Sequence, residues 1–245
     1  MNNDNQTKLQ EDEYKRPYHH LINLSPFSLY DYLSWGLIYY SYVSEVVEKI
    51  DYSSYGSVAE VGCGDGKITI ELAKKYPKNQ FVGYDISDRA IQYAKAFGGQ
   101  YKNLAFHTDD FLTVEGTFDA IVCVETLEHI PDEEIPGFVS SLRKRTKKRL
   151  IVSVPTTNVS LNPKHFRHYD LELLKKHLVG FELIDHKFIY RNNWLSWLLA
   201  QILANRLFIT RTQHIIRPVL RIHNKFCRYG SNTEGWHIVA SFRPV

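Results

Sequence analysis

Val58-Ala59-Glu60-Val61-Gly62-Cys63-Gly64-Asp65-Gly66 is the stretch that decides the fold of this 245-residue chain. The apolar residues before Gly62 predict a short buried strand, and the three glycines predict a tight turn. Apolar residues then recur at helical spacing in the run 67–75, so a helix follows the turn. A second apolar strand at 80–84 leads to Asp85. Together these segments predict a strand, turn, helix and strand in succession.

The glycine turn predicts a site for a nucleotide-like ligand. Glycines let the backbone approach a ligand closely, here at the start of a helix, where open N–H groups face outward. Asp85 ends the next strand nineteen residues after Gly66, where a carboxylate can accept both hydroxyls of a ribose. Glu60 stands two residues before Gly62, and a carboxylate there repels phosphate and suits a cationic guest. The alternative is a glycine-rich turn that binds nothing, and the presence of both parts in order argues against it.

The pattern E-x-G-x-G-x-G, followed by an acid after the second strand, resembles the first two motifs of class I S-adenosylmethionine-dependent methyltransferases. The resemblance implies that S-adenosyl-L-methionine is the cofactor. It also implies an acid for the adenine amino group and an apolar residue against the ring, both in the loop after the third strand. The cofactor-binding residues that we expect are Glu60, Gly62, Gly64, Gly66, Asp85, Ile86, Asp110 and Phe111, with Asp109 as the alternative to Asp110.

Composition indicates an ordinary globular protein. With 44% hydrophobic and 23% charged residues, 245 residues can bury a large single core but would hardly supply two compact domains. The three cysteines give neither an even disulfide framework nor a C-x-x-C metal spacing, which favours a reducing compartment. Residues 1–13 are polar, and no segment reaches the length of a membrane span. We expect a cytoplasmic protein without a signal peptide, with a peripheral position at the inner membrane surface as an alternative.

Strands alternate with helices over most of the chain, which predicts an α/β fold. We expect a Rossmann-like, doubly wound, mostly parallel seven-stranded sheet with an N-terminal helical cap and a helical insertion before the last strand. The predicted segments are 1–56 for the tail and cap, 57–190 for the methyltransferase core, 191–234 for the basic amphipathic insertion and 235–245 for the last core strand. The predicted strands are 57–61, 80–84, 103–107, 118–124, 149–154, 181–190 and 236–242.

The N-terminal segment is rich in aromatic residues before the helical run 30–50. A cap that precedes the sheet often crosses the carboxyl ends of the strands in this fold. Tyr14, Tyr18, His19 or His20 could therefore touch the substrate. The alternative is that these rings only pack the cap on the sheet.

A second informative stretch is Glu125-Thr126-Leu127-Glu128-His129, which follows the apolar strand 118–124. If the chain turns helical there, the side chains at i, i+3 and i+4 project from one face. The loop after strand 149–154 contains His165 and His168, and either histidine can approach the same edge of the sheet. Two carboxylates held so close repel each other unless a cation or a proton intervenes.

E-x-x-E-H with a later histidine resembles the metal site of small-RNA 3′-terminal 2′-O-methyltransferases, and a similar motif occurs in ubiquinone-biosynthesis O-methyltransferases. The resemblance implies a metal held by Glu125, Glu128, His129 and His165. Such mixed ligands favour Mn²⁺, Co²⁺, Fe²⁺ or Zn²⁺ over Mg²⁺. Without a metal, His129, His165 or His168 would act as the general base.

The insertion carries a strong local charge. From Arg191 to Arg228 the chain has seven arginines and lysines and no acid, against a net charge of +3 for the whole chain. A basic, tryptophan-bearing amphipathic segment suits an anionic membrane surface, a lipid-linked or phosphorylated substrate, or RNA. The alternative for residues 191–228 is a helical hairpin that packs on the cap, with its arginines merely solvated.

Three classes of function follow from these patterns. The favoured class is S-adenosylmethionine-dependent O-methylation of a small or lipid-linked hydroxyl compound, such as a sugar or a phenol. The second is an RNA 2′-O-methyltransferase, and the third is a non-catalytic cofactor-binding or membrane-docking protein. The residues after strand 118–124 do not form the D/N-P-P-Y/F motif of amide and adenine N-methylation, and the chain lacks the Pro-Cys nucleophile of cytosine C5 methylation. Oxygen is therefore the expected acceptor atom.

Overall fold

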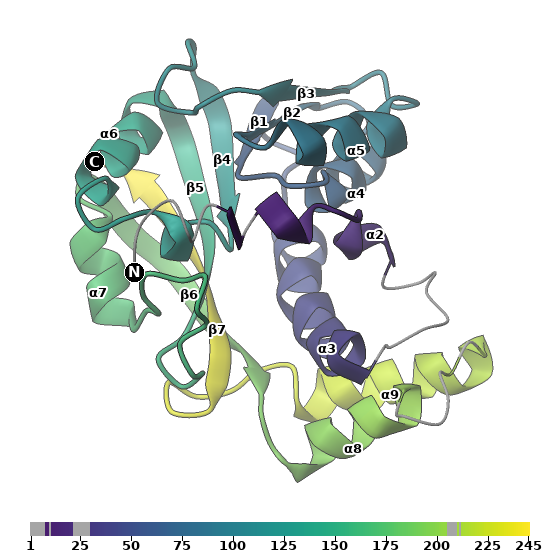
Figure 1. Cartoon of the computed structure of the whole chain (residues 1–245). Helices are drawn as coiled ribbons and strands as arrows, with labels where there is room; N and C mark the ends of the chain where they lie inside the picture. The colour runs from purple at the N-terminus through teal and green to yellow at the C-terminus, as the bar shows by residue number, and fades with distance from the viewer. Residues whose placement is uncertain (1–7, 10, 22–29, 205–209, 211) are drawn as a thin grey trace.

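The computed structural model describes residues 8–9, 11–21, 30–204, 210 and 212–245. Seven strands form one sheet in the order β3-β2-β1-β4-β5-β7-β6 (Figure 1). Strand β7 alone runs in the opposite direction to the other six strands. This confirms the predicted mostly parallel, Rossmann-like sheet. The strands are β1 (Ser57–Val61), β2 (Gln80–Asp85), β3 (Leu104–Thr108), β4 (Phe118–Val124), β5 (Thr146–Pro155), β6 (Phe181–Arg191) and β7 (Gly235–Pro244).

Helices cover both faces of the sheet (Figure 1). The described helices of four residues or more are α2 (Tyr18–Leu21), α3 (Tyr30–Ser44), α4 (Lys67–Lys75), α5 (Asp88–Gly98), α6 (Ile135–Arg145), α7 (Leu171–His177), α8 (Trp194–Leu203) and α9 (Gln213–Phe226), and a π-helical turn, Glu45–Lys49, extends α3. Successive side chains along β4 point to opposite faces of the sheet, so they join two separate parts of the hydrophobic core. Val122 and Val124 pack in the core under α3 and α4, whereas Ile121 and Cys123 pack in the core under α6 and α7.

One local expectation about the E-T-L-E-H stretch is wrong. The chain does not continue from β4 into an α-helix: Glu125 has a φ of 49°, and only Leu127–His129 form a short 3₁₀ turn, η2. The backbone N–H of Glu125 donates to the carbonyl of Ser153 on β5, 2.9 Å away, which holds this residue in the sheet. Glu125 and Glu128 therefore do not share a helical face.

The insertion before β7 forms a helical hairpin that packs on the cap. Helices α8 and α9 contact each other, α8 contacts α3, and the buried side chains of Leu199, Leu203 and Val219 join the core cluster that α3 helps to form. Two arginines of the segment make ion pairs, Arg191 with Glu234 and Arg228 with the buried Glu45. Arg206 and Arg211 lie outside the described residues.

Among the helices of the described residues, we find none whose length and apolarity would let it cross a lipid bilayer.

Candidate active site

A cavity of about 680 Å³ lies at the carboxyl ends of the central strands, within the size range of small-molecule sites. Its walls come from the glycine turn after β1, the ends of β2 and β4, the loop after β5 and the first residues of β7. Helix α3 and the N-terminal segment close the remaining side with Tyr39, Tyr42, Tyr14 and Tyr18. The cavity thus joins the predicted cofactor turn to the predicted catalytic residues.

The glycine turn has a backbone that other residues would adopt only with strain. Gly62, Gly64 and Gly66 have φ values of 71°, 55° and 78°. A Cβ at position 64 would collide with the hydroxyl of Tyr14, and one at position 62 would collide with the side chain of Thr126. Only glycine fits at these two positions, and both line the cavity, so the backbone of the turn is open to a cofactor there.

Asp85 and Glu60 line the cavity on either side of this turn. Asp85 accepts hydrogen bonds from the backbone N–H groups of Gly64 (2.8 Å) and Ser87 (2.9 Å), and burial raises its pKa. Glu60 accepts a hydrogen bond from the hydroxyl of Thr69, and burial raises its pKa to about 8. Glu60 is thus protonated at neutral pH unless a cation lies beside it, which agrees with a cationic guest.

The other predicted cofactor residues differ in exposure: Ile86 and Asp110 are exposed, whereas Phe111 is buried. Ile86 is 69% exposed beside the turn, and Asp109 donates its backbone N–H to the carbonyl of Asp85, 3.2 Å away. The Asp110 carboxylate accepts from the backbone N–H of Leu112 (2.9 Å), so it stabilises its own loop. Phe111 is buried in the core on the α6 and α7 side and does not line the cavity. The position of Phe111 favours a packing role over the predicted ring contact.

The N-terminal segment is fastened to the glycine turn. His19 donates its backbone N–H to the buried Asp65 carboxylate (3.1 Å), and its Nδ1 lies 2.9 Å from the same group. Nε2 of His20 lies 3.0 Å from the carbonyl of Asp65. Glu13 forms an ion pair with Lys164 of the loop after β5. The segment therefore spans the cavity, as the position of the cap before the sheet predicted.

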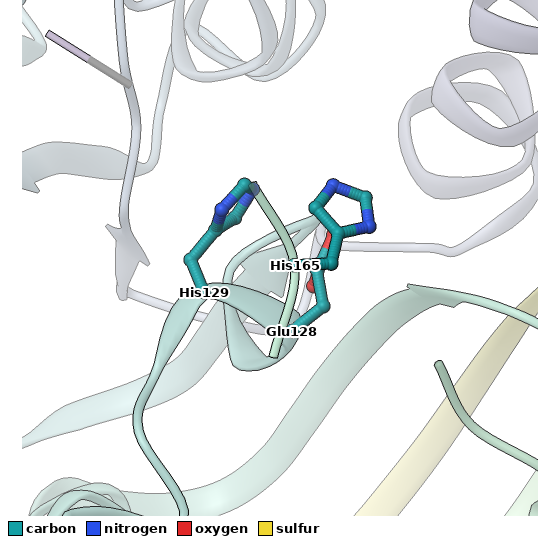
Figure 2. Close-up of side chains that lie close together, drawn as sticks. All are labelled: Glu128, His129 and His165. Atoms are coloured by element: carbon teal, nitrogen blue, oxygen red, sulfur yellow. The ribbon is translucent and has the colours of Figure 1, made fainter. Parts of the chain in front are cut away.

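Glu128, His129 and His165 converge at the other end of the cavity, where one ligand atom of each lies within 4.8 Å of the others. Figure 2 shows the two imidazole rings on either side of Glu128. The Glu128 side chain is fully buried, and neither of its oxygens has a hydrogen-bond partner among the described residues. Burial, and then the charge of Glu125, raise the pKa of Glu128 well above its usual range.

Hydrogen bonds fix which nitrogens of the histidines face the cluster. Nδ1 of His168 lies 3.0 Å from the carbonyl of Val159, and because a carbonyl only accepts, this nitrogen carries the proton. Nε2 of His168 then accepts from Nδ1 of His165, 2.8 Å away. Nδ1 of His129 likewise donates to the carbonyl of Lys164 at 3.3 Å. His129 and His165 are therefore each left with an Nε2 lone pair.

Burial disfavours the charged form of these imidazoles. Burial, and then the neighbouring His129 and His168, lower the pKa of His165 to about 2. Burial also lowers the pKa of His129 and of His168. Two imidazole nitrogens and one buried carboxylate without a hydrogen-bond partner are a donor set that suits a divalent metal.

Glu125 is separate from this cluster. Its carboxylate accepts a hydrogen bond from the hydroxyl of Ser153 (2.8 Å) and lies 3.0 Å from Nε2 of His237. The left-handed backbone at Glu125 turns the side chain toward β5 and β7. The structure thus brings together three of the four predicted metal ligands, and the fourth is held by its own partners.

His237 also lines the cavity, although no sequence motif predicts it as a site residue. It lies at the start of β7, lines the cavity, and its ring packs on Tyr42 with 4.8 Å between centroids. The antiparallel register of β5 and β7 pairs His237 with Pro155, directly before the loop that carries His165. The predicted last strand contained this residue, but no local motif marks it, because a tertiary strand pairing brings it to the site.

A family model described as a methyltransferase domain matches residues 58–149. Trans-aconitate 2-methyltransferase of Deinococcus radiodurans is 31% identical over 114 residues, which are 46% of this chain and 42% of that protein. Ubiquinone biosynthesis O-methyltransferase of Nitrosomonas europaea is 30% identical over 131 residues, which are 51% of this chain and 52% of that protein. The chain therefore spans about half the length of these curated relatives, or slightly less.

Among solved structures, magnesium protoporphyrin IX methyltransferase from Synechocystis PCC 6803 with bound SAH is similar, with a TM-score of 0.56 and 18% identity over 86% of this chain and 83% of that one. At this identity the likeness concerns the fold. The family match includes Glu125, Glu128 and His129, but a domain match identifies no metal ligands, so the metal motif stays a prediction. Together, the glycine turn, the sheet order and these matches show that the chain carries a methyltransferase domain with the class I S-adenosylmethionine-dependent fold.

Proposed function

We propose that this protein transfers a methyl group from S-adenosyl-L-methionine to a hydroxyl oxygen of a small or lipid-linked compound. The observation that carries the proposal is the cluster of Glu128, His129 and His165 in the same cavity as the glycine turn. S-adenosylmethionine, when bound, supplies an electrophilic methyl group on a sulfonium. The turn and Asp85 support binding of its ribose and amino-acid parts. Asp110, with Asp109 as the alternative, is the proposed partner of the adenine amino group.

The histidines can take the proton that the acceptor loses. A hydroxyl is a weak nucleophile, and a base within hydrogen-bond reach increases its reactivity in the transition state. Nε2 of His129 and Nε2 of His165 hold free lone pairs, while the hydrogen bonds to Lys164 and His168 fix the two rings. His129 is the proposed proton acceptor, because a pKa of about 2 makes His165 a weak base that instead helps to position the acceptor.

A metal is the second way in which this cluster can act. Glu128, His129 and His165 would hold it, and a set of two imidazoles and one carboxylate favours Mn²⁺, Co²⁺, Fe²⁺ or Zn²⁺ over Mg²⁺. Such an ion would lower the pKa of the acceptor hydroxyl. Glu125, which pairs with Ser153 and His237, would then orient groups around the site and would not be a ligand.

The walls of the cavity favour a ring-shaped acceptor. Tyr39, Tyr42 and Trp236 line it beside the histidines, and flat aromatic walls suit a phenol ring or the apolar face of a sugar. The proposed acceptors are therefore phenols and sugars.

RNA with a 3′-terminal ribose is the second candidate, and the Glu128, His129 and His165 cluster is the observation that favours it. Its vicinal diol would offer two oxygens to this site. An acceptor of that size would also have to pass the N-terminal segment that spans the cavity.

The test is the release of S-adenosylhomocysteine from S-adenosylmethionine with a panel of phenols, sugars and short RNAs, with and without Mn²⁺. We expect turnover with a hydroxyl compound and none with its methoxy analogue. His129→Ala should lower turnover at least a hundredfold while S-adenosylhomocysteine binding persists. Turnover only with amine acceptors, or unchanged turnover in His129→Ala, would contradict the proposal.

A further inference from the structure

The helical hairpin α8–α9 leaves large apolar side chains in solvent. Trp194 is 74% exposed and Trp197 60%, on the same face of α8 as Leu198. On α9, Ile215, Ile222 and Phe226 are also exposed. The opposite face of α8 is buried, and on α9 the exposed apolar side chains border the buried Val219 and His223. Packing within the described residues leaves these six side chains in solvent.

A basic stripe lies beside the apolar one on α9. Arg217, Arg221 and Lys225 follow one another at four-residue spacing, so they share one face of the helix, and all three are exposed. None of them forms an ion pair with a described acid, in contrast to Arg191 and Arg228. At 100° per residue this stripe is next to the exposed apolar stripe and away from the buried face.

The two helices bring their aromatic residues to one end of the hairpin. The backbone N–H of Arg191 donates to the carbonyl of Cys227 (2.7 Å), and Sγ of Cys227 lies 3.9 Å from Oδ1 of Asn193. Trp194 and Phe226 directly adjoin these bonded residues in sequence, so the start of α8 lies beside the end of α9. Figure 1 shows both helices side by side at one edge of the molecule, beyond α3.

We propose that the outer face of the α8–α9 hairpin docks on an anionic lipid bilayer. Tryptophan prefers the headgroup region, aliphatic and phenylalanine side chains enter the acyl boundary, and basic residues attract anionic headgroups. RNA would accept the charges and could stack on the rings, but it offers no favourable place for Leu198, Ile215 and Ile222. Neither helix contains an acid, so the same face of a second copy would meet like charge.

Docking at this face would bring the cavity close to the bilayer. Helix α3 contacts α8 on one side and lines the cavity with Ile38, Tyr39 and Tyr42 on another. Two helix layers, α3 and the hairpin, therefore separate the site from the bilayer by about 20 Å. The docking itself does not depend on which acceptor the site takes.

The test is sedimentation of the full chain with vesicles of phosphatidylcholine mixed with phosphatidylglycerol, against vesicles of phosphatidylcholine alone. We expect binding to the anionic vesicles, falling with salt, and a blue shift of tryptophan emission. Arg217→Gln with Arg221→Gln should lower the partition coefficient about 25-fold, roughly fivefold for each basic residue. Trp194→Ser with Trp197→Ser should also weaken binding, because both side chains are exposed and their loss leaves the core intact.

The matched control is Lys175→Gln with Lys176→Gln, which removes two exposed charges from α7 on the opposite face of the sheet. This variant should bind the vesicles as the parent chain does. Equal loss in both charge variants would indicate a nonspecific charge effect and overturn the proposal. Absence of binding to anionic vesicles, with salt-sensitive retention of single-stranded RNA instead, would assign the face to RNA and also overturn it.

Discussion

Two buried carboxyl groups, Glu60 and Glu128, line this cavity. Glu128 has no hydrogen-bond partner among the described residues, whereas Glu60 accepts hydrogen bonds from Thr69. A buried carboxylate without a partner is costly, so each group stays protonated or meets a cation. Both raised pKa values therefore mark places where a charged ligand is favoured.

We predict that Glu128→Gln separates metal binding from folding. Because the amide has the shape of the protonated acid, the variant should fold with a free energy of unfolding within about 1 kcal/mol of the parent chain in the absence of metal. Mn²⁺ should stabilise the parent chain and have little effect on the variant, as measured by thermal unfolding. The exposed Glu115→Gln is the control and should respond to Mn²⁺ like the parent. Equal stabilisation of all three proteins would exclude Glu128 as a ligand.

Glu60 gives a prediction about pH. Its pKa of about 8 in the folded protein lies above the ordinary 4.5, so the folded state holds a proton that the unfolded state releases between these values. The free energy of unfolding should therefore fall as pH rises through this window, by up to a few kcal/mol. Glu60→Gln should remove that fall, and urea unfolding from pH 5 to 9 measures the difference. Parallel pH profiles for the two proteins would mean that Glu60 is ionised throughout.

The sequence predicted the strands of the sheet and the helix after the glycine turn closely, because glycine turns, apolar runs and helical spacing are local signals. It failed at Glu125, where pairing with the backbone of β5 overrides the continuation into a helix. It could not find His237 as a site residue, since an antiparallel strand register places that side chain. The tautomers of His129 and His165 likewise depend on carbonyls from a distant loop.

Two ion pairs at the ends of the α8–α9 hairpin, one buried and one exposed, give a prediction about stability. Arg228 and its partner Glu45 are both buried, and Glu45 also binds Lys187 and Tyr229. Arg228→Met should cost about 3 kcal/mol, because it removes one partner of a buried pair. Arg191→Met breaks a pair with Glu234 that is largely in solvent and should cost less than about 1 kcal/mol. Chemical unfolding measures both, and equal costs would show that Arg228 does not hold the hairpin.

The walls of the cavity come from segments that are far apart in the sequence, from Glu13 to His237. The N-terminal segment is bound to the glycine turn through His19 and Asp65 and to the loop after β5 through Glu13 and Lys164. Strand β7 closes the opposite side with His237. The core supplies the glycine turn, and the segments at both ends of the chain form the remaining walls of the cavity.

Calorimetric titration with S-adenosylhomocysteine measures whether the glycine turn and Asp85 bind the cofactor. We predict one equivalent bound by the parent chain and by His129→Ala, and no detectable binding by Asp85→Ala, because Asp85 faces the cavity and holds the turn through Gly64. Circular dichroism of the Asp85 variant checks that it is folded. If the parent chain binds a nicotinamide dinucleotide and no S-adenosylhomocysteine, the glycine turn does not serve S-adenosylmethionine.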